Sequence, residues 1–203
     1  MKTKFLGKTN NKSKKKGKNL LDNIPRTKED IKHGFDIWNV YDFMYLDKNM
    51  IPHLSVLEIT IPSNSDFIIE SKSMKLYLNH FYNKSFKTTS EISKIVKKDI
   101  EYKINSKIKV KFIKSFYKEP TVININKLKL KSSPIKKVLK FNGFRSICPV
   151  TSQPDFASIY IYSDRPIDLQ WLKHYLISFS DHGGFREQCI ELIFRKLKNK
   201  FLI

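Results

Sequence analysis

The chain has 203 residues, 40% of them hydrophobic and 13% aromatic, which is enough to bury one large core or two small ones and excludes a disordered protein. Its only cysteines, Cys148 and Cys189, argue against a disulfide framework. The net charge of +20 is typical of nucleic-acid binding, but only five of the 39 basic residues are arginines and the lysines are spread over every segment, which favours solvated surface lysines over a base-reading site.

Residues 1–19 contain no acidic residue and little that a core would bury. We expect them to form a basic mobile tail. A solvated arm explains such a tail, and contact with RNA or a membrane surface is the alternative. No apolar run of signal-peptide or membrane-spanning length follows, which favours a reducing, cytoplasmic setting.

Residues 20–116 are predicted to form a first half of strands and helices. The aromatic stretch 36–52 is too apolar to lie in water and is expected to pack across this half. The runs 53–62 and 66–83 are separated by Ser-Asn-Ser, which predicts a hairpin whose second arm turns helical.

Two further elements complete this half. Thr88 and Glu91 have the spacing of a capping box, and the apolar residues that follow predict a helix from about 89 to 104. Residues 107–116 alternate lysine with apolar side chains, which predicts a strand with one charged face.

Residues 117–137 contain a Ser-Ser-Pro turn signal and no sustained helical period, so a linker is predicted there. In 138–203, strand-like sequence is followed by two helices. Asp168 is positioned to cap the first helix, and the second follows a Gly-Gly break with Cys189 on its apolar face. The chain is therefore predicted to be an α+β protein with two related halves.

Cys148 is the candidate for covalent chemistry. Cys189 lies on an apolar helical stripe, where a cysteine packs as a small hydrophobic residue. Cys148 lies outside any such stripe, beside Pro149, at a bend that suits either a thiol facing a cleft or a structural cysteine. A thiolate there would be a nucleophile, favoured by Arg145 and the basic field of the chain.

Asp155 follows seven residues later, beyond a bend bounded by prolines, and can face the same cleft. It is either a proton donor to the group that the thiolate attacks or a turn-capping aspartate after Pro154. Glu70 and Glu187 are acids within core-like segments and therefore need partners. They are either salt-bridged or accept the N–H donors of a guanine-like edge.

Ser71, Lys72 and Ser73 place two hydroxyls and an ammonium beside Glu70, a set that suits a phosphate. The five histidines are scattered and no Cys/His cluster has ligand spacing, so no metal site is predicted. The sequence has no glycine-rich phosphate loop either.

These stretches resemble one family, the NADPH-dependent 7-cyano-7-deazaguanine reductases, which are the nitrile reductases of queuosine biosynthesis in tRNA modification. "ESKSMKLYLNHF" (70–81) is similar to the family's signature segment, and "CPVTSQPDFASIYI" (148–161) is similar to its catalytic segment. Their order, with "LGKT" (6–9), "IPR" (24–26) and "HGFDIW" (33–38), resembles the long two-domain form. The resemblance implies two tandem tunnelling-fold halves, each an antiparallel sheet with helices on one face, usually assembled as a homodimer.

The resemblance also implies roles for single residues. Cys148 matches the nucleophile that forms a covalent thioimide with the nitrile, and Asp155 matches the proton donor. The positions that match substrate-binding residues are Ile69, Glu70, Ser71, Arg186 and Glu187. Ser71 and Lys72 match positions that contact NADPH, two molecules of which supply the two hydrides that give the aminomethyl product.

Two departures from the family pattern mark this chain. Arg186 stands where the family has histidine, so this position carries a permanent charge that cannot shuttle a proton at neutral pH. The family continues past the last helix into another pair of strands with an Arg-Gly-Gly segment for NADPH, so the second half, 138–203, is expected to lack its last strands. The alternative function is a catalytically impaired relative that at most binds the deazapurine base or RNA.

Overall fold

The computed structural model describes residues 17–26 and 33–201. Within them the chain forms four α-helices and three small sheets, a mixed α+β fold. The chain divides into two compact units between Phe116 and Tyr117. Most of the predicted basic tail lies outside the described residues, and Gly17–Leu20 form a short 3-10 helix, η1.

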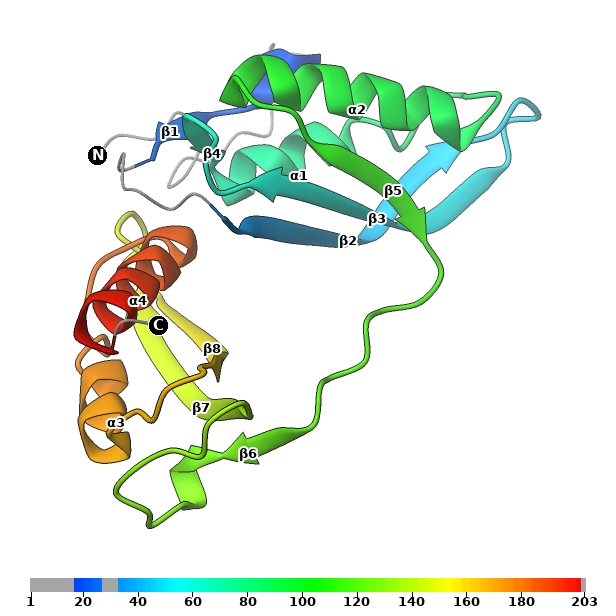
Figure 1. Cartoon of the computed structure of the whole chain (residues 1–203). Coiled ribbons are helices and arrows are strands. Elements are labelled where there is room, and N and C mark those ends of the chain that lie inside the picture. The colour runs from blue at the N-terminus through cyan, green and yellow to red at the C-terminus, as the bar shows by residue number, and fades with distance from the viewer. Residues whose placement is uncertain (1–16, 27–32, 202–203) are drawn as a thin grey trace. The chain divides into compact units, whose positions relative to one another are not determined.

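The first unit is built on an antiparallel sheet of three strands, β2 (Phe35–Leu46), β3 (Pro52–Pro62) and β5 (Lys109–Ile113), in the order β2-β3-β5. Helices α1 (Ser71–Asn79) and α2 (Thr89–Ile104) lie against the same face of this sheet (Figure 1). A second, two-stranded sheet pairs β1 (Asn23–Pro25) with β4 (Phe67–Ile69) directly before α1. The short strand β4 therefore fixes where α1 begins.

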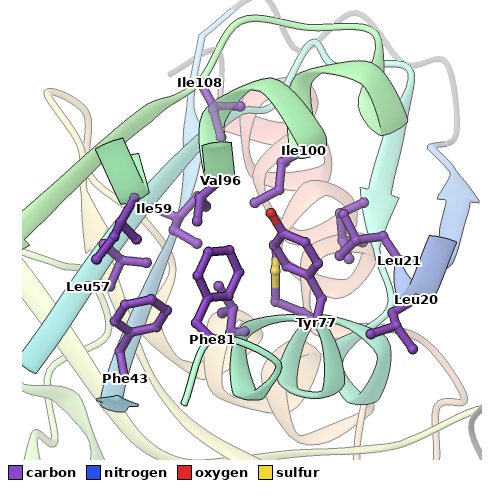
Figure 2. Close-up of a cluster of buried hydrophobic side chains, with 14 of the residues drawn as sticks. Leu20, Leu21, Phe43, Leu57, Ile59, Tyr77, Phe81, Val96, Ile100 and Ile108 are labelled. Atoms are coloured by element: carbon purple, nitrogen blue, oxygen red, sulfur yellow. The ribbon is translucent and has the colours of Figure 1, made fainter. Parts of the chain in front are cut away.

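The core of the first unit lies between the sheet and the two helices. Figure 2 shows Phe43 of β2 and Ile59 of β3 facing Tyr77 of α1 and Ile100 of α2. These side chains are at most 1% exposed. The Tyr77 hydroxyl donates a hydrogen bond of 2.9 Å to Asp99, and burial, together with this carboxylate, raises the pKa of Tyr77 far above its usual range. Tyr77 thus packs as a core residue with its one polar atom satisfied.

The helix predicted from about 89 to 104 is confirmed by α2, whose N-cap Thr88 accepts a hydrogen bond from the Glu91 N–H. The strand predicted in 107–116 is confirmed by β5, where Lys109 and Lys111 are exposed. Only one side of the aromatic stretch 36–52 packs on the core, since Tyr41 of β2 is 63% exposed.

The predicted hairpin between 53–62 and 66–83 is wrong. β3 pairs with β2 and β5, whereas β4 is only three residues long and pairs with β1. The hairpin in this region joins β2 to β3 instead, across a turn in which Asp47 accepts the N–H groups of Asn49 and Ile51 at 2.8 and 3.0 Å. The run after Ser-Asn-Ser cannot pair with β3, because β2 and β5 occupy the two edges of that strand.

The second unit has the order strand, strand, helix, helix that the sequence predicts. β7 (Val138–Ile147) and β8 (Pro154–Tyr162) are antiparallel, and α3 (Leu169–Ile177) and α4 (Arg186–Phe201) lie on one face of their sheet (Figure 1). Asp168 caps α3 by accepting the Trp171 N–H at 2.9 Å, which confirms the predicted cap.

The segment 117–137, expected to be a linker, carries β6 (Val122–Asn124) and a 3-10 helix, η2 (Ile125–Lys127). β6 pairs in parallel with β7, and Ile125 is fully buried in the second core. None of the helices in the described ranges is long and apolar enough to cross a membrane.

Candidate functional site

Cys148 opens the loop that joins β7 to β8. Its N–H donates to the Gln153 carbonyl at 2.9 Å, and its carbonyl accepts the Ser152 N–H at 3.0 Å. Ser152 has a positive φ of 56°, which turns the chain back toward β8. The loop is therefore closed by its own backbone, with the half-buried Cys148 side chain at its base.

The loop supplies hydrogen bonds that favour the thiolate of Cys148. Burial alone would raise the pKa of this thiol, but the Thr151 hydroxyl and the backbone N–H groups of Thr151 and Val150 donate to the sulfur. Their combined effect outweighs burial and the repulsion from Asp155, so the pKa of Cys148 lies below its usual value. A thiol of this kind is a stronger nucleophile near neutral pH than an ordinary cysteine.

Replacing Thr151 by valine is expected to raise the pKa of Cys148, because the hydroxyl that donates to the sulfur is removed while the side-chain volume is kept. The pH at which Cys148 reaches half of its maximal alkylation rate by iodoacetamide should therefore move upward, as measured by peptide mass spectrometry. Thr151→Ser keeps the hydroxyl and is the matched control. An unchanged midpoint in Thr151→Val would show that the hydroxyl does not stabilise the thiolate.

Asp155 is the second residue of β8 and lies opposite Ser146 of β7. Its side chain is 22% exposed. Its negative charge acts on Cys148, where it opposes formation of the thiolate. The bend between the two prolines therefore brings the thiol and the carboxyl group into one cluster, as the sequence suggests.

Arg186, the first residue of α4, belongs to the same cluster. Its Nη2 donates to Oδ1 of Asp155 at 2.5 Å. This hydrogen bond is the main reason that the pKa of Arg186 is raised, and the charges of Glu187 and Cys148 act in the same direction. Glu187 is half-buried beside it. The second unit thus unites four of the predicted site residues, from one hairpin and one helix end.

Cys189 is a core residue, although the charges of Asp155 and Glu187 also act on its thiol. It is 1% exposed, within the core of the second unit, and burial raises the pKa of its thiol. The interpretation of Cys189 as a core residue agrees with this placement.

In the first unit, Glu70 is the N-cap of α1. One carboxylate oxygen accepts the Lys72 N–H at 2.8 Å, and the other accepts the Ser73 N–H at 2.7 Å. The side chain is 1% exposed, and Ile69 before it is 2% exposed. The partner that a buried Glu70 requires is therefore, at least in part, the backbone of its own helix.

Glu70→Ala is expected to lower the free energy of unfolding of the first unit by about 1–2 kcal/mol, because two backbone donors lose their acceptor. Urea unfolding in a Trp171→Phe background, with the fluorescence of Trp38 as the signal, measures this unit by itself. Glu70→Gln keeps one acceptor oxygen and should cost less. If Glu70→Ala is as stable as the parent, the cap has no energetic role.

A pocket of about 770 Å³ lies between β2 and α1. Lys72 and Lys75 of α1 line it, together with Trp38 and Tyr41 of β2. Ser71 is exposed at the start of α1 and is not among the lining residues. Lys72 is a predicted site residue. Lys75, Trp38 and Tyr41 were not predicted to line a pocket, because no sequence signal shows which strand faces α1.

The predicted site residues fall into two groups, one in each unit. Ile69, Glu70, Ser71 and Lys72 surround the start of α1, and Cys148, Asp155, Arg186 and Glu187 gather beside the β7–β8 loop. Thr151 was missed, although a hydroxyl residue three positions after a cysteine, beyond a proline, is a usable sign of a turn that folds back on the thiol. In the described ranges, no three His, Cys, Asp or Glu side chains are grouped so that they could hold a metal ion.

Comparison with known proteins shows which family the chain belongs to. A family model described as "Nitrile reductase, 7-cyano-7-deazaguanine-reductase N-term" matches residues 13–112, and one described as "QueF-like protein" matches residues 154–201. The chain is 34% identical to the NADPH-dependent 7-cyano-7-deazaguanine reductase of Desulfotalea psychrophila. The alignment is 209 positions long and covers 92% of this chain and 74% of the relative. The chain belongs to this family.

Further members of the 7-cyano-7-deazaguanine reductase family match at similar levels. The relative from Buchnera aphidicola is 35% identical over 192 residues, which cover 82% of this chain and 72% of that protein. The relative from Acinetobacter baylyi is 33% identical over 187 residues, which cover 82% and 69%. The two family models together include Glu70, Asp155 and Arg186, whereas Cys148 lies between the two matched ranges.

Proposed function

We propose that this protein reduces the nitrile of 7-cyano-7-deazaguanine to an aminomethyl group with NADPH, in queuosine biosynthesis. The observation that carries the proposal is the cluster of Cys148 and Asp155 in a chain of the nitrile reductase family. A nitrile carbon needs a soft nucleophile, and the nitrogen that gains charge needs a proton. The second unit offers both groups at the base of one hairpin loop.

The first step is the addition of the Cys148 sulfur to the nitrile carbon. A bond forms between sulfur and carbon, one of the three carbon–nitrogen bonds becomes a nitrogen lone pair, and the nitrogen takes up a proton from Asp155 to give a thioimide. The lowered pKa of Cys148 means that its thiol proton is more easily removed for this attack. In the later reduction steps the sulfur leaves as thiolate.

The pocket beside α1 fits part of a dinucleotide. Its volume of about 770 Å³ lies within the range of roughly 300–1,000 Å³ that is common for small-molecule sites. The ammonium groups of Lys72 and Lys75 suit phosphates, and the rings of Trp38 and Tyr41 suit a planar base. We assign Lys72, with the neighbouring Ser71, to NADPH. Each NADPH would supply one hydride when bound, so reduction of a nitrile to an amine requires two NADPH molecules.

Recognition of the deazaguanine base is assigned to Glu70 and Glu187, with Ile69 and Ser71 in the adjoining stretch. Oε1 of Glu70 accepts the Lys72 N–H at 2.8 Å and the Ser71 hydroxyl at 3.4 Å. Within the described residues, Oε2 accepts only the Ser73 N–H at 2.7 Å, which leaves a lone pair on Oε2 for a donor of the base. Arg186 is the remaining residue that the family pattern gives to the substrate.

We further propose that each unit is one half of a tandem tunnelling fold and that the protein acts as a cytoplasmic homodimer. Support comes from the element order, because both units place an antiparallel strand pair before two helices that cover one face. Residues 20–116 and 138–203 are then the two halves, and 117–137 connects them, with its β6 and Ile125 packed onto the second half.

The purified chain tests the proposed function directly. Oxidation of NADPH, followed by its absorbance, should depend on added 7-cyano-7-deazaguanine and should be absent with deazaguanine that lacks the nitrile. No nitrile-dependent oxidation by a folded protein would favour the binding-only alternative. Salt-sensitive RNA binding that survives Cys148→Ala would then point to RNA as the ligand.

A further inference from the structure

Backbone hydrogen bonds between the end of β7 and the segment before α4 fix the position of Arg186. The Ile147 N–H at the end of β7 donates to the His182 carbonyl at 2.9 Å, and the Gly184 N–H donates back to the Ile147 carbonyl at 3.1 Å. The segment before α4 is thereby fixed to the residue that precedes Cys148. The first residue of α4 consequently has a set position relative to the hairpin that carries Cys148 and Asp155.

A cation at this position is unfavourable for the dipole of α4. The positive end of the helix dipole lies at the N-terminus, where an arginine is less favourable than an acid. Arg186 is 71% exposed, so it contributes little to the core, and it interacts with charged groups: it pairs with the carboxylate of Asp155, and the charges of Glu187 and Cys148 act on it. The interactions of Arg186 therefore indicate a role in the cluster of Cys148 and Asp155, and not in stabilising the fold.

The ion pair uses only one oxygen of Asp155. Nη2 of Arg186 donates to Oδ1, while no group in the described part of the chain donates to Oδ2. The side chain of Asp155 is 22% exposed, and its charge acts on the Cys148 sulfur. One oxygen is thus fixed, and the other is available for proton exchange.

We infer that Arg186 is a positioning residue that orients the Asp155 carboxylate as a proton shuttle between the Cys148 thiol and the nitrile nitrogen. This inference rests on the proposed function. The S–H bond breaks and its proton goes to Oδ2 of Asp155, the sulfur–carbon bond forms, and the same proton passes to the nitrogen. The thiol has then added across the carbon–nitrogen triple bond, with no proton taken from solvent and Asp155 returned to its starting form.

Arg186→Ala is expected to slow formation of the covalent adduct about ten- to a hundredfold, because a misplaced proton-transfer group costs rate. Intact-protein mass spectrometry after mixing with 7-cyano-7-deazaguanine, without NADPH, measures this rate. Arg195→Ala removes the same side chain from the same helix and should keep the parent rate. Arg186→Lys should recover part of the rate, as should added guanidinium ion with Arg186→Ala, at concentrations far below those that unfold proteins.

The affinity for 7-cyano-7-deazaguanine distinguishes a role of Arg186 in orienting Asp155 from a role in binding the base. In a Cys148→Ala background, Arg186→Ala should weaken binding of 7-cyano-7-deazaguanine by a much smaller factor than it slows adduct formation. A loss of affinity as large as the loss of rate, or an unchanged adduct rate in Arg186→Ala, would overturn the positioning role while leaving the proposed function intact. Absence of any adduct in the parent protein would refute the proposed function, and the positioning role with it.

Discussion

Cys148→Ala is expected to abolish covalent adduct formation and to lower nitrile-dependent NADPH oxidation by more than about a thousandfold. The sulfur is the group that bonds to the nitrile carbon, and no other side chain of the β7–β8 loop is a comparable nucleophile. Intact mass and NADPH absorbance measure the two effects. The mutant should still bind the nitrile substrate, because the residues assigned to the base are unchanged.

Cys189→Ala is the matched control for this prediction. It removes the only other thiol, which is 1% exposed and packed in the core of the second unit. We expect it to lower the free energy of unfolding by about 1 kcal/mol, through a small cavity, and to leave the adduct rate unchanged. Loss of activity in a well-folded Cys189→Ala protein would overturn its assignment to the core.

Asp155→Asn is expected to lower the rate of nitrile reduction by about 10²–10⁴-fold while changing the affinity for 7-cyano-7-deazaguanine much less. The amide cannot carry the proton that the nitrogen requires, and it leaves the charge of Arg186 without its counter-ion. Single-turnover kinetics give the rate, and titration in a Cys148→Ala background gives the affinity.

The control for Asp155→Asn is Asp181→Asn. Asp181 also pairs with an arginine of the second unit, Arg145, at 3.1 Å, but its side chain is 96% exposed. An exposed pair of this kind contributes little, so this variant should keep the parent rate and stability. Equal losses of rate and affinity in Asp155→Asn would contradict its role in proton transfer.

The parts of the fold that were predictable depend on signals carried by neighbouring residues. Thr88 and Glu91, which lie within four positions of each other, are enough to predict where α2 begins. The alternation of lysine with apolar residues is enough to predict β5. Strand pairing has no such local signal. No residue pattern within 53–62 indicates that this strand pairs with 35–46. The run at 66–83 is nearer in sequence and was therefore predicted, incorrectly, as its partner.

The candidate site shows the same limit. Cys148 and Asp155 lie in one hairpin, so two prolines and seven positions suffice to suggest that they meet. Arg186 is 31 positions from Asp155, and only the fold brings the two together.

Glu70 shows a different limit, because its need for a partner was predictable while the identity of that partner was not. Glutamate is not among the preferred N-cap residues, so the sequence does not indicate that the backbone of α1 is its partner.

The measurement that tests the account most directly is the ratio of NADPH oxidised to 7-cyano-7-deazaguanine consumed, with the product identified by mass spectrometry. Reduction of a nitrile to an amine takes two hydrides, so we predict a ratio of two, an aminomethyl product, and no consumption with Cys148→Ala. Oxidation of NADPH without consumption of the nitrile, or consumption that persists in Cys148→Ala, would contradict the proposed chemistry.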